Sequence, residues 1–229
     1  MTATHYLKYL QEFITPDRKR RIDEVLQKRT NFLTIALEDV YQLHNTSAVM
    51  RSCEIFGIQN LFVIEQSFGK RVDVEIAMGA QKWVDIHRYQ KMQDAVDLFK
   101  KKGIQIIATT PHEDAISLEY FELTHPSAVL FGTEKYGLSD EIMQQADVKI
   151  KIPMSGFTES FNISVAASLI MYSLSNQLRS SNLPWQLSEE QILMKSIDWT
   201  QKSIRSLADV KKRYEEEFGA IPPLPHSFF

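Results

Sequence analysis

Three short polar segments carry the residue types in this sequence that could do chemistry. The first holds His44 and Asn45 with Arg51 a little further on, the second is the glycine-bracketed loop 132–139, and the third is the loop 154–162. Each follows an apolar run that predicts a β-strand. Ligands of open α/β sheets bind at the carboxyl ends of the strands, and helix starts attract anions. The pattern favours a site for a polar or anionic ligand; ordinary strand-to-helix crossovers are the alternative.

The third segment has the clearest local signals. Pro153 and Gly156 force a loop after the strand predicted over 148–152. Ser160 and Asn162 are both good N-cap residues, so a helix is expected to begin at about Asn162. A polar loop that leads into a helix start is a suitable place for a ligand.

Several common chemistries are missing from the sequence. It has no Gly-x-Gly-x-x-Gly turn after the first predicted strand and no Walker loop, which argues against a dehydrogenase or an NTPase. No Cys/His cluster has metal-ligand spacing and no serine lies in a nucleophile elbow. We therefore expect no metal and no serine-hydrolase chemistry.

The composition is that of an ordinary globular protein. The 229 residues carry a formal net charge of −3, so a nucleic-acid partner would have to be bound by a local basic patch. A single cysteine, Cys53, allows no internal disulfide and suits a reducing compartment. No apolar run is long enough to cross a bilayer, and the N-terminus is unlike a secretory signal. We expect a cytoplasmic protein without a membrane partner.

The elements that must position the three segments alternate along the chain. Strands are predicted over 32–37, 60–64, 83–87, 104–109, 128–131 and 148–152. Helices are predicted over 46–56, 92–102, a short stretch before 148, and from Asn162 to about 178, with Asn45 or Thr46 as the cap of the first. This alternation predicts an α/β fold, with a parallel sheet covered by helices on both faces.

Helical extensions are expected on both sides of this core. We predict a basic N-terminal arm over 1–30, the core over 31–178 and a C-terminal extension over 179–229, in which Ser188 caps one long helix to about Phe218. Thr15 and Pro16 begin a helix in the arm. The arm's cations are Arg18, Lys19, Arg20, Arg21, Lys28 and Arg29. They form either a solvated helix face or a phosphate-contacting surface.

Three sequence blocks, in order, resemble the signature motifs of a known enzyme family. They are Asn45-Thr46-Ser47-Ala48-Val49-Met50-Arg51, then Leu130-Phe131-Gly132-Thr133-Glu134-Lys135-Tyr136-Gly137-Leu138, then Ile152-Pro153-Met154 with Ser160-Phe161-Asn162-Ile163-Ser164-Val165-Ala166. Together they are similar to the SpoU branch of the SPOUT RNA ribose 2′-O-methyltransferases. The basic arm and the block 79–84 are most similar to the TrmH family of tRNA guanosine methyltransferases.

The resemblance implies a fold, a cofactor and partners. It implies an open parallel sheet that ends in a trefoil knot, a homodimer, and methyl transfer from S-adenosylmethionine to a ribose in tRNA, at the D-loop guanosine 18. The helix from Asn162 to Leu178 would lie near the dimer interface, where its small residues allow close approach; packing on its own sheet is the alternative. A ribosomal RNA substrate, or a knotted RNA-binding protein without catalysis, are the other functions left open.

The resemblance also assigns roles to residues. Arg51 would be the catalytic arginine, as a base or as a stabiliser of the alkoxide; a guanidinium stays protonated, which favours the second role. Asn45 would orient Arg51 or the ribose. The other implied catalytic residues are Glu134, Ser160 and Asn162, and the implied cofactor-binding residues are Thr109, Leu130, Gly132, Ile152, Met154 and Phe161. RNA contacts would come from the arm, from His44 and Arg179, and from Lys202 and Arg205.

Overall fold

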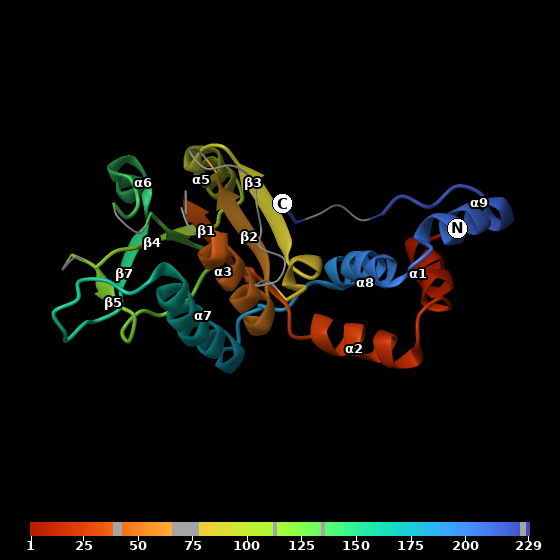
Figure 1. Ribbon diagram of the computed structural model, residues 1–229, viewed down its shortest axis with the longest axis horizontal. Coiled ribbons are helices and arrows are strands. Elements are labelled where there is room, and N and C mark those ends of the chain that lie inside the picture. The colour runs from red at the N-terminus through yellow and green to blue at the C-terminus, as the bar shows by residue number, and fades with distance from the viewer. Residues whose placement is uncertain (39–42, 66–77, 112–113, 134–135, 225–227) are drawn as a thin grey trace. The chain divides into compact units, whose positions relative to one another are not determined.

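The computed structural model describes residues 1–38, 43–65, 78–111, 114–133, 136–224 and 228–229 (Figure 1). They form two compact units. The helical unit joins Met1–Arg29 to Gln186–Phe229, and the sheet unit is Thr30–Trp185. The two ends of the chain, which the sequence predicts as separate extensions, are thus parts of the same unit.

The sheet unit is built on seven strands in the order β3-β2-β1-β6-β4-β7-β5, and every neighbouring pair is parallel. The strands are β1 (Thr30–Glu38), β2 (Ile58–Ile64), β3 (Asp85–Tyr89), β4 (Gln105–Thr109), β5 (Ile116–Ser117), β6 (Ser127–Phe131) and β7 (Val148–Lys151). β2 and β6 are buried along their whole length, as expected for central parallel strands with helices on both faces. The predicted α/β fold is confirmed.

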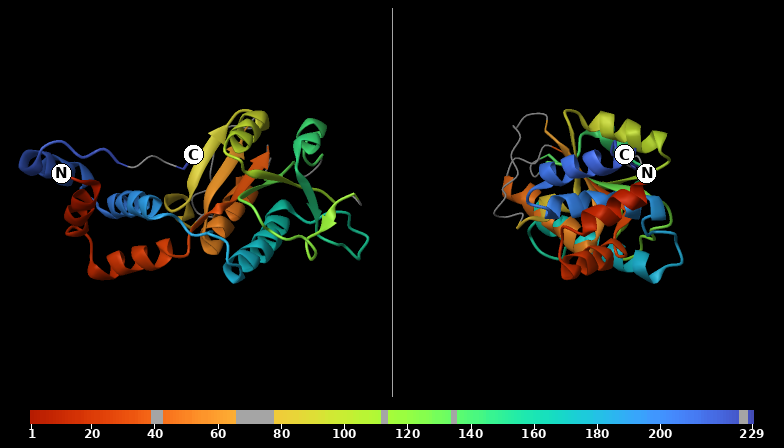
Figure 2. Two further views of the ribbon diagram at one scale, coloured as in Figure 1. Left: turned by 180° about the vertical axis from the view of Figure 1, so that it is seen from behind. Right: turned by 90° about the vertical axis from the view of Figure 1, so that its right-hand side faces the viewer.

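Helices cover both sides of this sheet (Figures 1 and 2). They are α3 (Leu43–Phe56), the 3₁₀ turn η1 (Ala80–Lys82), α5 (Met92–Lys101), α6 (Asp140–Gln145) and α7 (Ile163–Ser180). Figure 1 shows α3 and α7 on one side and α5 and α6 on the other. The largest apolar core lies between the sheet and the α3–α7 pair, with Met50, Cys53 and Met171 fully buried in it.

Three details of the sheet unit differ from the sequence prediction. α3 begins at Leu43, so Asn45 and Thr46 lie in its first turn and do not cap it. The strand predicted over 83–87 begins at Asp85, because Gly79 with φ 86° starts the 3₁₀ turn just before it. β5 was not predicted at all, since a two-residue strand in a polar loop carries no periodicity.

The helical unit contains α1 (Ala3–Gln11), α2 (Pro16–Leu26), α8 (Glu189–Ser203) and α9 (Leu207–Phe218). The Thr15 hydroxyl accepts from the N–H of Arg18, which confirms it as the cap of α2. Ser188 caps α8 in a reciprocal capping box with Gln191. Residues 221–224 are not helical, as their prolines predict.

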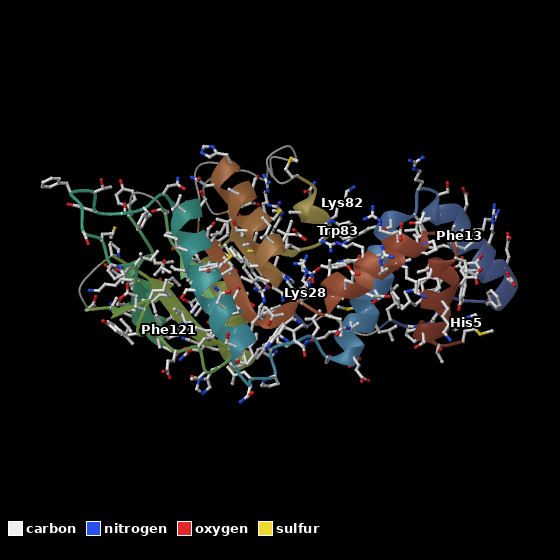
Figure 3. The ribbon with its side chains drawn as sticks, turned by 90° about the horizontal axis from the view of Figure 1, so that it is seen from below. His5, Phe13, Lys28, Lys82, Trp83 and Phe121 are labelled. Carbon is white, nitrogen blue, oxygen red and sulfur yellow. The ribbon has the colours of Figure 1, made fainter. Side chains whose placement is uncertain are left out.

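The single long helix predicted after Ser188 is wrong, because the chain turns at 204–206 and divides it into α8 and α9. The break has a packing reason. Tyr214 on α9 is fully buried against Tyr6 of α1, with ring centroids 4.8 Å apart, in a cluster at which Figure 3 labels His5. Burial raises the pKa of both tyrosine hydroxyls. An unbroken helix would carry Val210 and Tyr214 away from these partners and expose them.

No helix among the described residues is long and apolar enough to cross a membrane.

Candidate active site

The first and third polar segments meet where α3 packs on α7, side by side in Figure 3. Among the polar contacts that join these helices, two lie near the start of α7. The Nδ2 of Asn162 donates to the Oδ1 of Asn45 at 3.2 Å, and the hydroxyls of Ser52 and Ser168 lie 3.0 Å apart. Asn45 and Ser52 are seven residues apart, about two turns, and so share the face of α3 that meets α7. The two contacts fix how far α3 can slide along α7.

Arg51 lies between Asn45 and Ser52 in sequence. Its side chain leaves α3 beside the contact with α7, because one residue turns the helix by about 100°. Its side chain is exposed, and it forms no hydrogen bond or ion pair with another described residue. The neighbouring His44 is also exposed, whereas Asn45 is 2% exposed. α3 therefore offers a guanidinium to a ligand from a helix whose axial position is fixed.

A cavity of about 680 Å³ opens where the second and third polar segments meet the ends of β4 and β7. Its lining includes five of the six residues that the resemblance implies as cofactor-binding: Thr109, Gly132, Ile152, Met154 and Phe161. Ser160 also lines it. Such a volume is typical of small-molecule sites, which measure about 300–1,000 Å³. The structure thus gathers segments from four parts of the chain around one cavity.

Gly132 explains how the second segment folds back on itself. A Cβ at this position would stand 2.0 Å from both the carbonyl carbon of Gly137 and the nitrogen of Leu138. The loop is closed by paired backbone hydrogen bonds between Thr133 and Gly137, each 2.9 Å long. Gly137 has φ 69°, which also favours glycine. The close return of the backbone at Gly132 therefore shapes this wall of the cavity, which Thr133, Tyr136 and Leu138 also line.

Leu130 and Glu134 stand apart from the other predicted residues. Leu130 is fully buried and is not in the cavity lining; its carbonyl accepts from the Thr109 hydroxyl at 2.9 Å, which ties the end of β6 to the end of β4. Any contact of Leu130 with a ligand would have to go through its backbone. Glu134 lies outside the described residues.

The cavity has further lining residues that the sequence did not single out. Tyr136 borders it from within the second segment, Asp140 from the start of α6, and Lys149 and Lys151 from β7. Lys149 pairs with Asp114 at 2.7 Å. The alternation of polar and apolar residues along 148–152 is the signal that could have placed these lysines at the edge of the cavity.

The basic arm forms α1 and α2, and most of its cations are exposed on α2. Arg18, Lys19, Arg20 and Arg21 are on the exposed surface of the helix, and Ile22 and Leu26 are buried. Arg20 pairs with Asp17 at 3.0 Å, and its pair with Glu24 is longer at 3.7 Å. Exposed pairs of this kind contribute about 0–1 kcal/mol, so they would yield readily to a phosphate.

Two of the other cations expected at RNA are differently placed. Arg29 is fully buried, with its guanidinium carbon 5.1 Å from the ring centroid of Trp199, a cation–π arrangement inside the helical unit. It therefore differs from the exposed phosphate contact that the sequence suggests. Arg179 is exposed but donates to the Phe56 carbonyl at 2.7 Å at the end of α3. Lys28 is exposed, as expected.

The sequence profile of the SpoU rRNA Methylase family matches residues 32–172, well over half of the chain. The chain belongs to the SpoU rRNA methylase family. The match covers all three polar segments and the strands that carry them. The trefoil knot that the resemblance implies for this family stays a prediction.

Two named relatives are similar to this chain over most of their length. A protein of Borreliella burgdorferi named tRNA (guanosine(18)-2′-O)-methyltransferase is 41% identical over 79% of this chain and 83% of its own. The protein of the same name from Thermus thermophilus is 38% identical over 74% of this chain and 87% of its own.

A solved structure is similar over a comparable share of this chain. The crystal structure of the A. aeolicus TrmH/SpoU tRNA modifying enzyme is 32% identical and covers 81% of this chain and 96% of its own, with a TM-score of 0.75. The SpoU methyltransferase AviRb from Streptomyces viridochromogenes, solved in complex with AdoMet, is 24% identical with a TM-score of 0.59, and shows a shared fold.

Proposed function

We propose that this protein transfers a methyl group from S-adenosylmethionine to the 2′-hydroxyl of guanosine 18 in tRNA. The observation that carries the proposal is that relatives named for this reaction align with about three quarters or more of the chain. The family match over residues 32–172 includes the three polar segments gathered around the α3–α7 contact and the cavity.

The cavity fits the proposed cofactor. The backbone at Gly132 borders it without a Cβ, which allows the polar edges of an adenosine to approach the backbone closely. Met154, Ile163 and Ile170 add apolar surface for a flat base, while Thr109 and Ser160 add hydroxyls. When bound, the cofactor would supply an activated methyl group on a sulfonium.

The protein's own residues would then make the ribose hydroxyl reactive. A ribose hydroxyl is a poor nucleophile, and negative charge builds on its oxygen as its proton passes to water, before that oxygen takes the methyl group. The exposed guanidinium of Arg51 is suited to stabilise that charge or to hold a neighbouring phosphate. Asn45 would orient Arg51 or the ribose, and Ser160 and Asn162 would bind the substrate or the arginine. Glu134 would hold a polar loop or a partner arginine.

We assign RNA capture to the helical unit and catalysis to the sheet unit. The helical unit carries 13 Lys and Arg against 11 Asp and Glu, and the sheet unit carries 13 against 18. The net negative charge of the chain therefore resides in the sheet unit. A polyanion would be attracted to the helical unit, first of all to the cations of α2.

We further infer a homodimer formed through α7. Val165, Leu169 and Tyr172 of α7, which recur at three- and four-residue spacing, are 42–59% exposed on the described chain, and Phe161, just before the helix, is 44% exposed. Ile55 of the adjacent α3 adds to this apolar surface at 64% exposure. A stripe of this kind is typical of a surface that another helix covers. A second copy of α7 would bury the same stripe by symmetry.

The reaction is tested with S-adenosylmethionine carrying a labelled methyl group, offered with unmodified tRNA and with unmodified ribosomal RNA. Label on the ribose of tRNA guanosine 18 is the expected result. Label in ribosomal RNA would instead favour the substrate named by the family, and label in neither RNA, at full cofactor binding, would indicate an RNA-binding protein without catalysis.

Replacing Arg51 by alanine should lower the rate of transfer at least about a hundredfold, because a charge-stabilising group is then missing from the transition state. The dissociation constant for S-adenosylmethionine, measured by calorimetry, should stay within about twofold, since Arg51 is not in the cavity lining. Arg88→Ala, which removes a guanidinium outside the three segments, should leave the rate unchanged. Equal loss of cofactor binding and transfer would make Arg51 a structural residue.

A further inference from the structure

The loop that joins β7 to α7 carries a fully exposed aromatic ring. Phe157 is 109% exposed, the highest value among the large apolar side chains of the described residues. Residues 155–161 around it are exposed as well, and the loop extends outward from the end of β7 (Figure 1). Even a Cβ on the adjacent Gly156 would meet only the Thr158 nitrogen, at 4.0 Å. The ring therefore lies in solvent with open space beside it.

The backbone of this loop is also open to a partner. In the part of the chain that the structure describes, no hydrogen bond, ion pair or ring contact holds residues 153–161. Backbone N–H groups are strong donors, and in nucleic-acid complexes they bind phosphate and sugar oxygens. The loop thus offers a flat apolar ring and several backbone donors at the same place.

Both ends of the loop border the cavity. Met154 lines it where the chain leaves β7, and Glu159 and Ser160 line it where the chain returns toward α7. The tip, residues 155–158, is not in the lining. Because Phe157 is only two residues from Glu159, a ribose that reaches a methyl donor in the cavity brings its neighbouring nucleotides close to this ring.

The surroundings of Phe157 favour a nucleic acid over a second protein chain. Its neighbours are Ser155, Gly156, Thr158 and Glu159, so one ring stands alone in a polar loop. The core of a protein interface combines several apolar side chains, as the stripe on α7 does. RNA suits the loop better, since an unstacked base accepts an aromatic ring while ribose and phosphate oxygens accept from hydroxyls and backbone N–H groups.

We propose that Phe157 is an RNA-binding residue whose ring stacks on an unstacked base next to the nucleotide that is methylated. The proposal rests on the methyl transfer inferred above. A base inside a double helix has both faces covered, so the contact would favour RNA in which the bases beside the target are unpaired. The stack would tolerate any sequence at this place, because every base has a flat face.

Phe157→Ala should raise the dissociation constant for unmodified tRNA about tenfold, the effect of one lost base–aromatic stack. The dissociation constant for S-adenosylmethionine should stay within about twofold, because Phe157 is not in the cavity lining. Tyr120→Ala is the matched control, since it removes a ring that is 80% exposed in the same unit and outside the lining. An unchanged tRNA constant in Phe157→Ala, or an equal loss in both variants, would overturn the proposal.

The shape of the side chain separates a base stack from an apolar contact with a second copy. Phe157→Tyr keeps the flat ring and should keep the affinity for tRNA. Phe157→Leu keeps apolar surface without a ring and should lose most of what Phe157→Ala loses. A contact with a second copy would instead accept leucine, and Phe157→Ala would then show a lower mass in light scattering during gel filtration. Those two results together would assign the ring to the dimer and refute the stack.

A further readout does not depend on methyl transfer. Phe157→Trp places an indole at the tip of the loop, and stacking on a base should quench its fluorescence when unmodified tRNA is added. The same titration of the unaltered protein, which contains three tryptophans, gives the background to subtract. If the unaltered protein methylates no RNA, the proposed function fails, while the quenching still decides whether a base stacks on this side chain. A titration without added quenching would exclude the stack.

Discussion

At the scale of single residues, the second polar segment depends on the absence of a side chain at Gly132. The segment returns so closely that its backbone occupies the place of a Cβ. A search of the sequence for functional groups does not find such a site residue, since a glycine has no side chain. What it offers is close approach of two backbones, and here that approach shapes the wall of the cavity.

Gly132→Ala should therefore damage cofactor binding more than a mutation of any single lining side chain. The new methyl group meets backbone atoms at 2.0 Å, so the loop must move, at a cost of about 1–3 kcal/mol or more. We expect the affinity for S-adenosylmethionine to fall at least about tenfold in a calorimetric titration. Gly156→Ala is the control, because its Cβ would meet nothing closer than the Thr158 nitrogen at 4.0 Å. Wild-type affinity in Gly132→Ala would refute this explanation of the loop.

The sequence could place only those site residues whose positions follow from short-range patterns. Asn162 was placed correctly as a cap, because a polar residue before an apolar helix is a short-range pattern. The burial of Arg29 could not be foreseen, since it results from Trp199, 170 positions away in the chain. The contact of Asn45 with Asn162 is likewise a product of packing between distant helices, and it was missed in favour of a local capping role.

At the scale of elements, the sequence predicted which segments are helices and strands but not where long ones break. The alternation of buried strands with amphipathic helices gave six of the seven strands, because each has its own periodicity. The turn between α8 and α9 contains no proline or glycine from which the sequence could predict it. It exists because Tyr214 packs against the aromatic side chains of α1, a tertiary contact.

The exposed stripe of α7 leads to a prediction at this scale. Leu169→Glu would place a charge in the middle of the proposed helix pair, where burial without a partner is costly. We expect a dimer for the unaltered protein and a monomer for the variant, measured by light scattering during gel filtration. Ile116→Glu places the same charge at a similarly exposed position of β5 and should leave the dimer intact. A monomer before any mutation would exclude the proposed interface.

At the scale of the whole molecule, the charges of the chain are divided between its two units. A net charge of −3 suggests a poor partner for RNA, yet the helical unit alone is positive. The sequence could show the basic helix but not that it shares a unit with the C-terminal segment. The net charge of the chain therefore understates the attraction of a polyanion to the cations of the helical unit.

Reversing Arg20 and Arg21 to glutamate should weaken tRNA binding and flatten its dependence on salt. Each phosphate contact that is lost should reduce the slope of log K against log salt by about 0.7–0.9, because fewer counterions are released on binding. The measurement is a filter-binding titration across salt concentrations. The matched control reverses Lys100 and Lys101, two exposed cations on α5, and so changes the net charge equally from the sheet unit. An equal loss of slope in both variants would mean that total charge, not α2, governs the association.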